Sequence, residues 1–529
     1  MSSALKNLIN KFEDSLIRLW NTDSRNRLGL AISGGVDSMA LASLCGTLAN
    51  KKAGGPTFTG FIVDHGLRDE SKQEAQSVVT ELQKLDIEAR VLTLDWSPYG
   101  GDATKVSNFE STARQLRYRA IGKACYEQNI QSLLVAHHSD DLAETVLLRI
   151  LMKYLGNGLQ GVKAEARIPD TVGIYGVCSS GQPSLLDMPE QIAIEGGGIT
   201  ISRPLLPFTK EQLVSICRER SVKWFEDATN ADRSLTTRNT LRYLFKESLL
   251  PEALQRDRLL AVSQSATDKI AKIEAAANAA LQSTKLTLDL RVGKLSFVLD
   301  ETLFSETDTP ETYGVKCSIM RSLITLVSPQ ESILQQRLQE AVSFVFEEKA
   351  FANSATTVAG CLLRRTNTRD AEFTIERMPP LRRANGEYTV LSSIDPLYPD
   401  PKWQLWDGRY WIRVGLSKMD TNVAVRFWKR EDLSALKESG LFTTRLRQLQ
   451  SSLALAPGDL RFTLPAIVVQ SNHEFDIKEK VVALPSLGWS AEGWKRSPNA
   501  SNAHSTWDIR YKHIDLERTD HHDIVDEHP

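Results

Sequence analysis

The sequence has few cysteines and no long apolar run. Its six cysteines lie far apart and form no CxxC pair, so neither a zinc ribbon nor a disulfide framework is indicated, and a reducing compartment fits best. No uncharged apolar segment approaches the ~18 residues of a membrane span. The amino-terminal residues make a poor secretory signal and a weak organellar one. These absences predict a globular protein with no membrane partner.

The sequence also has no marked excess of acidic or basic residues. The 529 residues carry a net charge of −2 and a calculated pI near 6.5, which excludes a globally basic nucleic-acid coat but leaves room for local basic patches. The balance of 41% hydrophobic and 25% charged residues is typical of a globular fold. A chain of this length is expected to form two or three domains.

The first 250 residues alternate short apolar runs with helical patterns. Strands are predicted at 28–32, 58–63, 89–94 and 133–136, and helices at 71–85, 108–127 and 140–153. This alternation predicts an α/β fold with a doubly wound parallel sheet, whose ligands lie at the carboxyl ends of the strands.

The rest of the chain predicts a different organisation. A Gly-, Pro- and Ser-rich stretch at 164–198 has no clear period and is interpreted as an inserted loop. One long helix is expected over 251–283 and another over 317–347, and FTIER, YWIRV, LPAIVV and VVALP have strand character. The predicted division is a catalytic domain at 1–250, a helical linker or middle domain at 251–350, an α+β domain at 351–495 and a polar tail at 496–529.

A polar loop separates the first predicted strand from the helix after it. It consists of Ser33, Gly34, Gly35, Val36, Asp37 and Ser38. The two glycines allow close approach to an oxyanion, and the following helix start favours a negative charge. A carboxylate beside phosphate is repulsive unless a cation lies between them, so Asp37 indicates Mg²⁺ bridging to nucleotide phosphates. The alternative is an ordinary Gly-rich turn with a capping serine.

A second polar segment follows the strand at 133–136. His137 ends that strand, and Asp141 and Glu144 share one face at the start of the next helix, where two carboxylates suit a cationic amine. His137 is a candidate for proton transfer because imidazole titrates near neutrality. Alternatively, His137 is a hydrogen-bonded histidine that closes the strand. The acids could likewise be ordinary residues of the first helical turn.

The loop resembles the SGGxDS loop of the PP-loop ATP pyrophosphatases, which cleave ATP between the α- and β-phosphates and adenylate an oxygen. Other segments resemble one family among them, the tRNA(Ile)-lysidine synthetases. They are FIVDHGLRDES (61–71), ESTARQLRYRAI (110–121), LLVAHHSDDLAETVLLRIL (133–151), RPLLPFTKEQL (203–213) and WFEDATNADRSLTTRNTLR (224–242). The resemblance is strong over residues 28–245 and thin beyond them.

The resemblance implies a reaction and a set of site residues. ATP is attacked by the C2 carbonyl oxygen of the wobble cytidine in the CAU anticodon of tRNA(Ile), and the ε-amine of L-lysine then displaces AMP. The loop from Ser33 to Ser38, with Asp64 and His65, is assigned to ATP, Asp37 to Mg²⁺, and Asp141 and Glu144 to lysine. Asp37, Arg114 and His137 are the candidate catalytic residues.

Partners and location are expected from weaker signals. The candidates for tRNA contact are Arg117, Arg364, Arg365, Arg382, Arg383 and Arg430, and Trp428 is a candidate for stacking on a base. Relatives imply a homodimer, and the likeness to fungal members implies a mitochondrial location. A tRNA thiolation enzyme, an amidotransferase-type synthetase and a non-catalytic tRNA-binding protein are the alternatives, of which the first would need cysteines in the loop or a CxxC.

Overall fold

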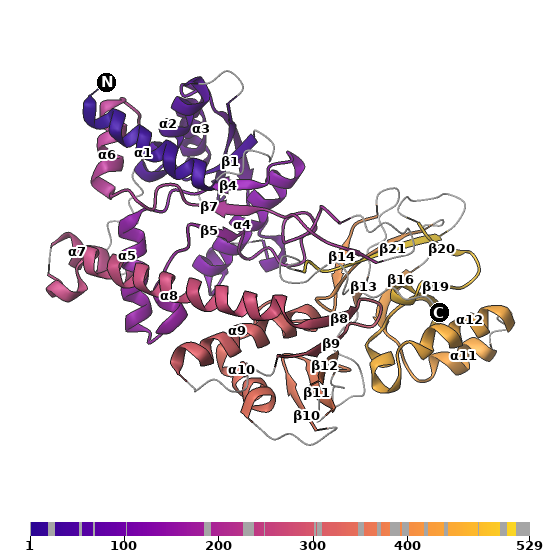
Figure 1. Ribbon diagram of the computed structural model, residues 1–529. Coiled ribbons are helices and arrows are strands. Elements are labelled where there is room, and N and C mark those ends of the chain that lie inside the picture. The colour runs from indigo at the N-terminus through magenta and orange to yellow at the C-terminus, as the bar shows by residue number, and fades with distance from the viewer. Residues whose placement is uncertain are drawn as a thin grey trace. The chain divides into compact units, whose positions relative to one another are not determined.

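The computed structural model forms two compact units (Figure 1). Unit 1 contains Met1–Gly181 and Gly197–Ala271, and unit 2 contains Gln182–Gly196 and Lys272–Pro529. The residues described are 2–19, 27–51, 55–66, 69–101, 103–184, 192–225, 237–247, 249–300, 303, 309–347, 354–367, 372–380, 392–393, 401–416, 422–438, 443–473, 476–497 and 505–514. Among the described helices, none combines the length and the apolar character needed to cross a lipid bilayer.

Unit 1 alternates strands and helices as the sequence predicts. Its strands are β1 (Arg27–Ile32), β2 (Thr57–Asp64), β3 (Glu88–Thr93), β4 (Ser132–Leu134), β5 (Glu165–Arg167) and β7 (Thr200–Ser202). Its helices are α1 (Ser3–Leu19), α2 (Val36–Lys51), α3 (Asp69–Gln83), α4 (Phe109–Glu127), α5 (Ser139–Leu151), α6 (Lys210–Glu219) and α7 (Thr237–Lys246). Helix α8 (Arg256–Gln282) begins in this unit, and it confirms the long helix expected after residue 250.

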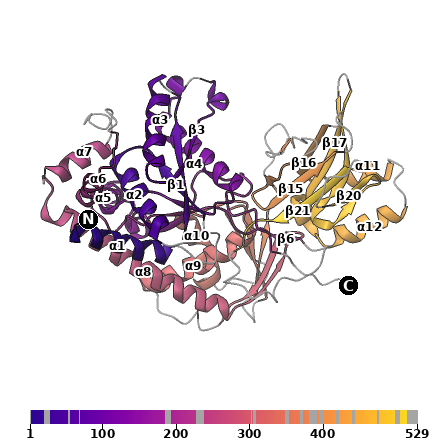
Figure 2. The ribbon, with the colours of Figure 1, turned by 90° about the horizontal axis from the view of Figure 1, so that it is seen from above.

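The strands of unit 1 form one sheet in the order β3-β2-β1-β4-β7-β5, in which only β5 is antiparallel to its neighbour. Neighbouring side chains of β2 point to opposite faces of the sheet. Ile62 packs in the core that contains α1, α2 and α6, and Phe61 packs in the core that contains α4. Figure 2 shows the helices gathered around this sheet. The doubly wound α/β fold is therefore confirmed.

The strand order has a switch point between β1 and β4. The chain moves outward from β1 to β3 on one side and continues through β4 and β7 on the other. The loops that follow β1 and β4 therefore leave the same sheet edge next to one another, which is where open α/β sheets bind ligands. These loops carry the two polar segments singled out in the sequence.

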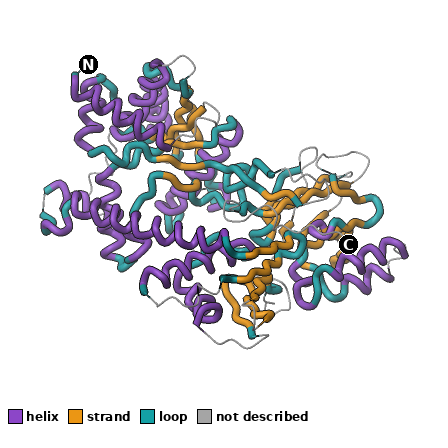
Figure 3. Tube along the Cα trace, viewed as in Figure 1, coloured by secondary structure: helices purple, strands orange, loops and turns teal. Residues whose placement is uncertain are grey.

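Unit 2 is an α+β assembly rich in strands (Figure 3). Its described strands form three five-stranded sheets. Two have the orders β10-β11-β12-β9-β8 and β13-β16-β17-β18-β19, and the third has the order β14-β15-β21-β20 with β6 paired to β21. Their bounds are β6 (Ala193–Ile194), β8 (Lys285–Asp289), β9 (Lys294–Val298), β10 (Ala355–Val358), β11 (Cys361–Asn367), β12 (Glu372–Arg377), β13 (Ser392–Ser393), β14 (Gln404–Trp406), β15 (Tyr410–Gly415), β16 (Asn422–Phe427), β17 (Pro465–His473), β18 (Asp476–Leu484), β19 (Trp489–Ser490), β20 (Trp494–Arg496) and β21 (Ser505–Tyr511). The helices are α9 (Pro310–Val327), α10 (Gln335–Val342), α11 (Asp432–Glu438) and α12 (Thr443–Ala454).

Several sequence expectations differ from the structure. The stretch 164–198 contains β5 and β6, so it is not simply a loop, and its residues 182–196 belong to unit 2. The helix expected over 317–347 is two helices, α9 and α10. The expected middle domain is not separate, because β9 pairs with β12, and the expected tail supplies β21, which pairs with β15. Strand pairing between distant segments leaves no local signal, which explains the differences in strands and domains.

Candidate active site

The loop after β1 is a tight turn that starts helix α2. Gly34 has φ +83°, and a Cβ atom there would lie 2.8 Å from Val78 Cγ2, so no other residue fits without strain. The Ser38 hydroxyl donates to the carbonyl oxygen of Gly35 at 2.9 Å and lies 3.3 Å from the Ser33 hydroxyl. The turn therefore presents main-chain amides and two hydroxyls at a helix start, the arrangement that suits an anion.

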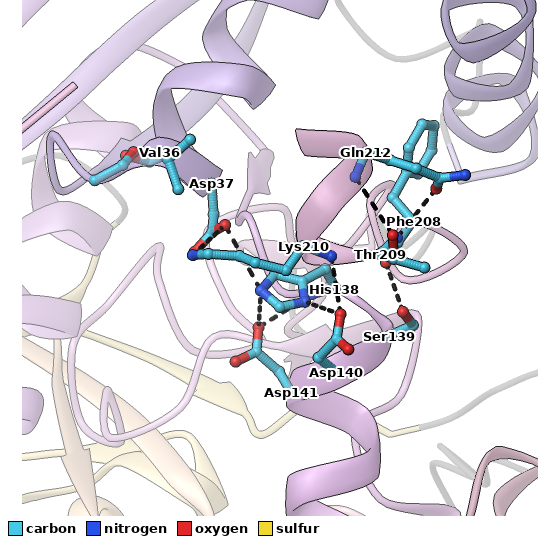
Figure 4. Close-up of polar contacts among 12 residues, drawn as sticks. Val36, Asp37, His138, Ser139, Asp140, Asp141, Phe208, Thr209, Lys210 and Gln212 are labelled. Carbon is cyan, nitrogen blue, oxygen red and sulfur yellow. Dashed lines mark hydrogen bonds and ion pairs between the residues drawn. The ribbon is translucent and has the colours of Figure 1, made fainter. Parts of the chain in front are cut away.

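Asp37, in the first turn of α2, is paired with a lysine from a distant helix. Lys210 Nζ donates to both carboxylate oxygens of Asp37 at 2.8 Å (Figure 4). Lys210 is the first residue of α6, and its main-chain N–H donates to Asp140 Oδ2 at 2.9 Å. Burial would raise the pKa of Asp37, but His138 and Lys210 offset that effect and hold it below its ordinary value.

His138 links the polar segments after β1 and β4. Its Nε2 lies 3.6 Å from Asp37 Oδ1 and 3.5 Å from Asp141 Oδ2, and its Nδ1 lies 3.3 Å from Asp140 Oδ2 (Figure 4). Burial opposes the imidazolium, but the surrounding carboxylates prevail and raise the pKa of His138 to about 10. The same pairing lowers the pKa of Asp140 to about 2, against the effect of its own burial. His138 is therefore a buried cation at neutral pH.

The acidic pair Asp141 and Glu144 lies at the start of α5. Arg242, on α7, donates through Nε to both Glu144 oxygens at 2.9 and 3.1 Å and through Nη2 to Asp141 Oδ1 at 3.4 Å. Glu144 is buried, with 8% of its side chain exposed, whereas the Arg242 side chain is 46% exposed. The two carboxylates thus form one anionic surface, as their spacing predicts, and a cation of the chain lies on it.

His137 belongs to a different cluster from its neighbour His138. Arg203 Nε donates to His137 Nδ1 at 3.3 Å. A guanidinium has no acceptor, so Nδ1 must carry the lone pair and the ring proton is assigned to Nε2. Burial lowers the pKa of Arg203, and the neighbouring Arg114 lowers it further. In this tautomer Nε2 of His137 is a hydrogen-bond donor. The role of His137 in proton transfer stays a prediction.

The oxygen atoms around Asp37 suit a magnesium ion only in part. Within the described residues, no group of three or more His, Cys, Asp or Glu side chains has the arrangement of a metal site. Mg²⁺ in nucleotide sites needs only one or two carboxylates, because phosphates and water supply the other ligands. Asp37 can supply such a carboxylate if one of its oxygens binds the metal ion while the other keeps its bond to Lys210, or if Lys210 moves away.

Comparison with known proteins agrees with this geometry. Residues 8–249 match the family model described as PP-loop domain. A "Probable tRNA(Ile)-lysidine synthase" of Schizosaccharomyces pombe is 27% identical over 490 residues, which cover 91% of this chain and 96% of that protein. A "tRNA(Ile)-lysidine synthase" of Rickettsia prowazekii is 25% identical over 91% of this chain and 94% of that one.

The matched residues 8–249 contain the whole sheet of unit 1. A bacterial "tRNA(Ile)-lysidine synthase", from Bradyrhizobium sp., is 32% identical over 253 residues, which cover 48% of this chain and 61% of that protein. Similarity to this relative therefore extends over about half of the chain.

Other predicted site residues of unit 1 have structural partners. Asp64 Oδ1 accepts hydrogen bonds from the Gly66 N–H at 2.9 Å and from the Ser71 hydroxyl at 2.6 Å, and the main-chain oxygen of His65 accepts from Trp96 at 2.9 Å. These contacts shape the turn between β2 and α3. The assignment of Asp64 and His65 to ATP stays a prediction, and the buried Asp64 has a structural role beside it.

Arg114 and Arg117 lie on α4. Among the described residues, neither contacts the cluster around Asp37. The Arg114 guanidinium is 4.9 Å and the Arg117 guanidinium 5.4 Å from the Tyr118 ring centre, and Arg114 Nε lies 3.3 Å from Asp170 Oδ2. Two cations thus lie beside one aromatic ring, and Arg203 interacts electrostatically with Tyr118 and Arg114. This cluster is suited to an anion such as a phosphate, and the role of each arginine stays a prediction.

The candidates for tRNA contact in unit 2 differ in exposure. Arg430 is exposed, Arg364 is half-buried, and the Arg365 guanidinium lies 5.4 Å from the ring centre of buried Phe373. Arg382 and Arg383 lie outside the described residues. The expectation that Trp428 stacks on a base is wrong, because its side chain is buried in a core that also contains Leu449 and Leu464.

The sequence did not single out the cations of this site. Lys210 lies 173 positions from Asp37, and Arg242 lies 98 positions from Glu144. The sequence favours His137 over its neighbour His138 as a site residue. All three lie inside segments that resemble the lysidine synthetases. Their charge within those segments could have marked them as site residues. Only the fold shows which acid each cation pairs with.

Proposed function

We propose that this protein is a tRNA(Ile)-lysidine synthase. It would join L-lysine to C2 of the wobble cytidine in the CAU anticodon of tRNA(Ile), with ATP as the source of energy. The observation that carries the proposal is the acidic pair Asp141 and Glu144, held at the sheet edge where the glycine loop also ends. Similarity to a fungal relative of that name over 91% of the chain supports it.

Two chemical steps account for the reaction. The C2 carbonyl oxygen of cytidine attacks the α-phosphorus of ATP, forming an O–P bond and releasing pyrophosphate. The neutral ε-amine of lysine then attacks C2, forming a C–N bond, and AMP leaves with the oxygen. No covalent bond to the protein is required, so positioning and charge stabilisation supply the catalysis.

Each part of the site has a task in this scheme. The turn from Ser33 to Ser38 would hold the phosphates, and Asp37 would hold a Mg²⁺ ion that neutralises phosphate charge. Lys210 lies beside Asp37 and can donate to the same phosphates. His137, with its proton on Nε2, would donate a hydrogen bond to a developing oxyanion, together with Arg114 and Arg203.

The test follows the two steps separately. Purified protein is incubated with ATP, Mg²⁺ and a tRNA(Ile) transcript with a CAU anticodon, and pyrophosphate and modified cytidine are measured with and without lysine. Lysine-dependent AMP release and a mass increase on cytidine 34 are expected. AMP release driven by a sulfur donor or by glutamine instead of lysine would contradict the proposal.

The thiolation alternative lacks a reactive cysteine at the loop. All six cysteines are free thiols, and Cys217 is the one with a contact near the loop, from Sγ to the Val36 carbonyl oxygen at 3.6 Å. Burial raises the pKa of Cys217 to about 12, so the thiolate that such chemistry needs is disfavoured.

Compartment and oligomeric state are proposed from the resemblance to fungal and bacterial synthetases. We infer a mitochondrial location, to be tested by fractionating cells that express the tagged protein and probing for it in purified mitochondria. We also infer a homodimer, which sedimentation equilibrium tests directly. A single species with the 59.0 kDa mass of one chain would contradict it.

A further inference from the structure

The loop between β3 and α4 is longer than the usual connection of an α/β fold. Residues 94–108 separate Thr93, the last residue of β3, from Phe109, the first residue of α4. Strand-to-helix loops of parallel sheets mostly have about two to six residues, and longer loops with packing of their own are frequently functional. The loop leaves the carboxyl edge of the sheet, which is the edge that carries the glycine loop.

This loop has its own small core. Trp96 is buried together with Leu94 and Ala103. The Trp96 ring stacks on that of Phe109, with 5.5 Å between the ring centres. Trp96 Nε1 also donates to the main-chain oxygen of His65 at 2.9 Å, which joins the loop to the turn after β2. The chain itself fixes the loop by these contacts, so the side chains that the loop exposes are held in place.

Tyr99 is an aromatic residue that this loop presents to solvent. It lies in the 3-10 turn Ser97–Tyr99, and 42% of its surface is exposed. Its hydroxyl donates to Gln115 Oε1 at 3.1 Å, which holds the ring against α4. The same helix carries Arg114 and Arg117, whose guanidinium groups suit a phosphate. An exposed aromatic ring next to a helix with such cations is the combination that binds single-stranded nucleic acid.

The spacing of the strands brings this loop within reach of a nucleotide next to the reacting one. In the sheet, β2 alone separates β3 from β1. Neighbouring strands lie about 4.8 Å apart, so the ends of β1 and β3 are about 10 Å apart. The wobble cytidine has to reach ATP at the turn from Ser33 to Ser38. A base linked to that cytidine can therefore lie over the loop that carries Tyr99.

The proposed reaction leaves one base of the anticodon without a stacking neighbour. Enzymes that act on a base take it out of the stack, and the cytidine must likewise turn out for its C2 oxygen to attack the α-phosphorus. The adenine that follows it in the CAU anticodon then loses contact on one face. A purine has a large π surface, and an aromatic side chain can replace the missing base.

We propose that Tyr99 stacks on the adenine of the CAU anticodon and so stabilises the turned-out cytidine beside the nucleotide. The hydrogen bond to Gln115 positions the ring for this contact. Stacking of this kind tolerates different bases but requires an unpaired one, which an anticodon loop supplies. This inference rests on the proposed function.

The test removes the base from the RNA and the ring from the protein. One substrate is the intact tRNA(Ile) with a CAU anticodon, and the other has an abasic site in place of the adenine. Tyr99→Ala should lower kcat/KM for pyrophosphate release about five- to a hundredfold with the intact tRNA. With the abasic tRNA the same substitution should cost less than about twofold, because the contact is already lost.

A second measurement reports the stacking itself. 2-Aminopurine in place of the adenine fluoresces weakly when it is stacked and strongly when it is not. With saturating wild-type protein or Tyr99→Phe the fluorescence should stay low, and with saturating Tyr99→Ala it should rise severalfold. Tyr99→Phe should also keep kcat/KM within about twofold, since it retains the ring and loses only the bond to Gln115.

Two further variants control for surface exposure and for folding. Tyr154→Ala removes another exposed tyrosine, which follows α5 and contacts Arg149, and should leave both tRNAs unaffected. Tyr99→Leu keeps apolar bulk against α4 without a π surface, and should behave as expected for Tyr99→Ala even if that variant does not fold. An equal loss with the intact and the abasic tRNA would overturn the inference, because Tyr99 would then serve the fold. Unchanged use of the intact tRNA, or low 2-aminopurine fluorescence with Tyr99→Ala, would also do so.

Failure of the inference differs from failure of the proposed function. If the wild type releases no pyrophosphate with the intact tRNA, or incorporates no lysine, the proposed function is wrong. If the wild type forms lysidine but the effect of the abasic site does not depend on Tyr99, the function stands and only the stacking contact is rejected.

Discussion

Lys210 and Asp37 are 173 positions apart in the sequence, yet Lys210 Nζ lies 2.8 Å from both carboxylate oxygens of Asp37. This pair joins the start of α6 to the start of α2. The Lys210 main-chain N–H also binds Asp140 at the start of α5. Three helix starts therefore meet at one place, and their dipoles add to the attraction for an anion.

The first prediction concerns Asp37. Asp37→Asn removes the charge proposed to hold Mg²⁺ without changing the side-chain volume, so release of pyrophosphate from ATP should fall by about a hundredfold or more. The variant should still fold, with a lower thermal unfolding midpoint, because Lys210 and His138 lose a charged partner. Asp95→Asn is the matched control, at an aspartate whose Oδ1 accepts a hydrogen bond from the Ser97 N–H at 2.9 Å. Ordinary AMP formation by Asp37→Asn would remove Asp37 from the mechanism.

The second prediction separates lysine use from adenylation. Glu144→Gln weakens a charged hydrogen bond worth about 1.5 to 3 kcal/mol, so the apparent affinity for lysine should fall by about one to two decades. Adenylation should proceed, and adenylated tRNA should accumulate until high lysine rescues the product. Pyrophosphate release and lysine incorporation are measured over a lysine titration, with the exposed Glu247→Gln as the control. If both rates decline together at every lysine concentration, Glu144 serves the nucleotide or the fold.

The third prediction is a pH dependence of stability that comes from His138. Its pKa is raised from 6.5 to about 10 in the folded protein. The protonated form is favoured by folding, so this stabilisation is complete below pH 6.5 and declines as pH rises toward 10, by about 1.4 kcal/mol per pH unit. Denaturant titrations from pH 6 to 10 should show this slope in the wild type and a shallower one in His138→Gln. Equal slopes would mean that His138 is neutral in the folded state.

The fourth prediction concerns the tautomer of His137. Because Arg203 donates to Nδ1, the proton should be on Nε2. Long-range ¹H–¹⁵N correlations on protein labelled at histidine can identify the protonated nitrogen. In Arg203→Met this preference should be lost, and adenylation should slow by about ten- to a hundredfold if His137 acts as a donor. A proton on Nδ1 in the wild type would instead favour His137 as an acceptor.

The fifth prediction concerns tRNA binding by unit 2. Reversing the charge of Arg364 and Arg430 together should weaken tRNA affinity and reduce the slope of log K against log salt by about one to two. The same double reversal at the exposed Lys6 and Lys84 of unit 1 is the control for net charge. An unchanged salt slope would place both arginines away from the tRNA. Arg426 is not a candidate, because it is buried against Asp432 and Glu479.

The sequence alone determined the class of fold and the acids of the site. Strand and helix periods in the first 250 residues are local signals, and the burial of β1, β2 and β4 strengthens them. The bounds of β1 to β4 and of their helices therefore lie close to the predicted ranges. The glycine loop and the pair Asp141 and Glu144 are also local, since a turn and one helix face need only a few consecutive residues.

The tertiary structure alone decided which charges neutralise these acids and which segments share a sheet. Lys210, Arg242 and Arg203 reach their partners from other helices and strands, and no spacing within the chain encodes such a meeting. Pairing of β21 with β15 likewise joins residues about one hundred positions apart. Side-chain charge and strand propensity are properties of single residues and short segments, whereas pKa, tautomer and strand partner depend on what the folded chain brings within a few ångströms.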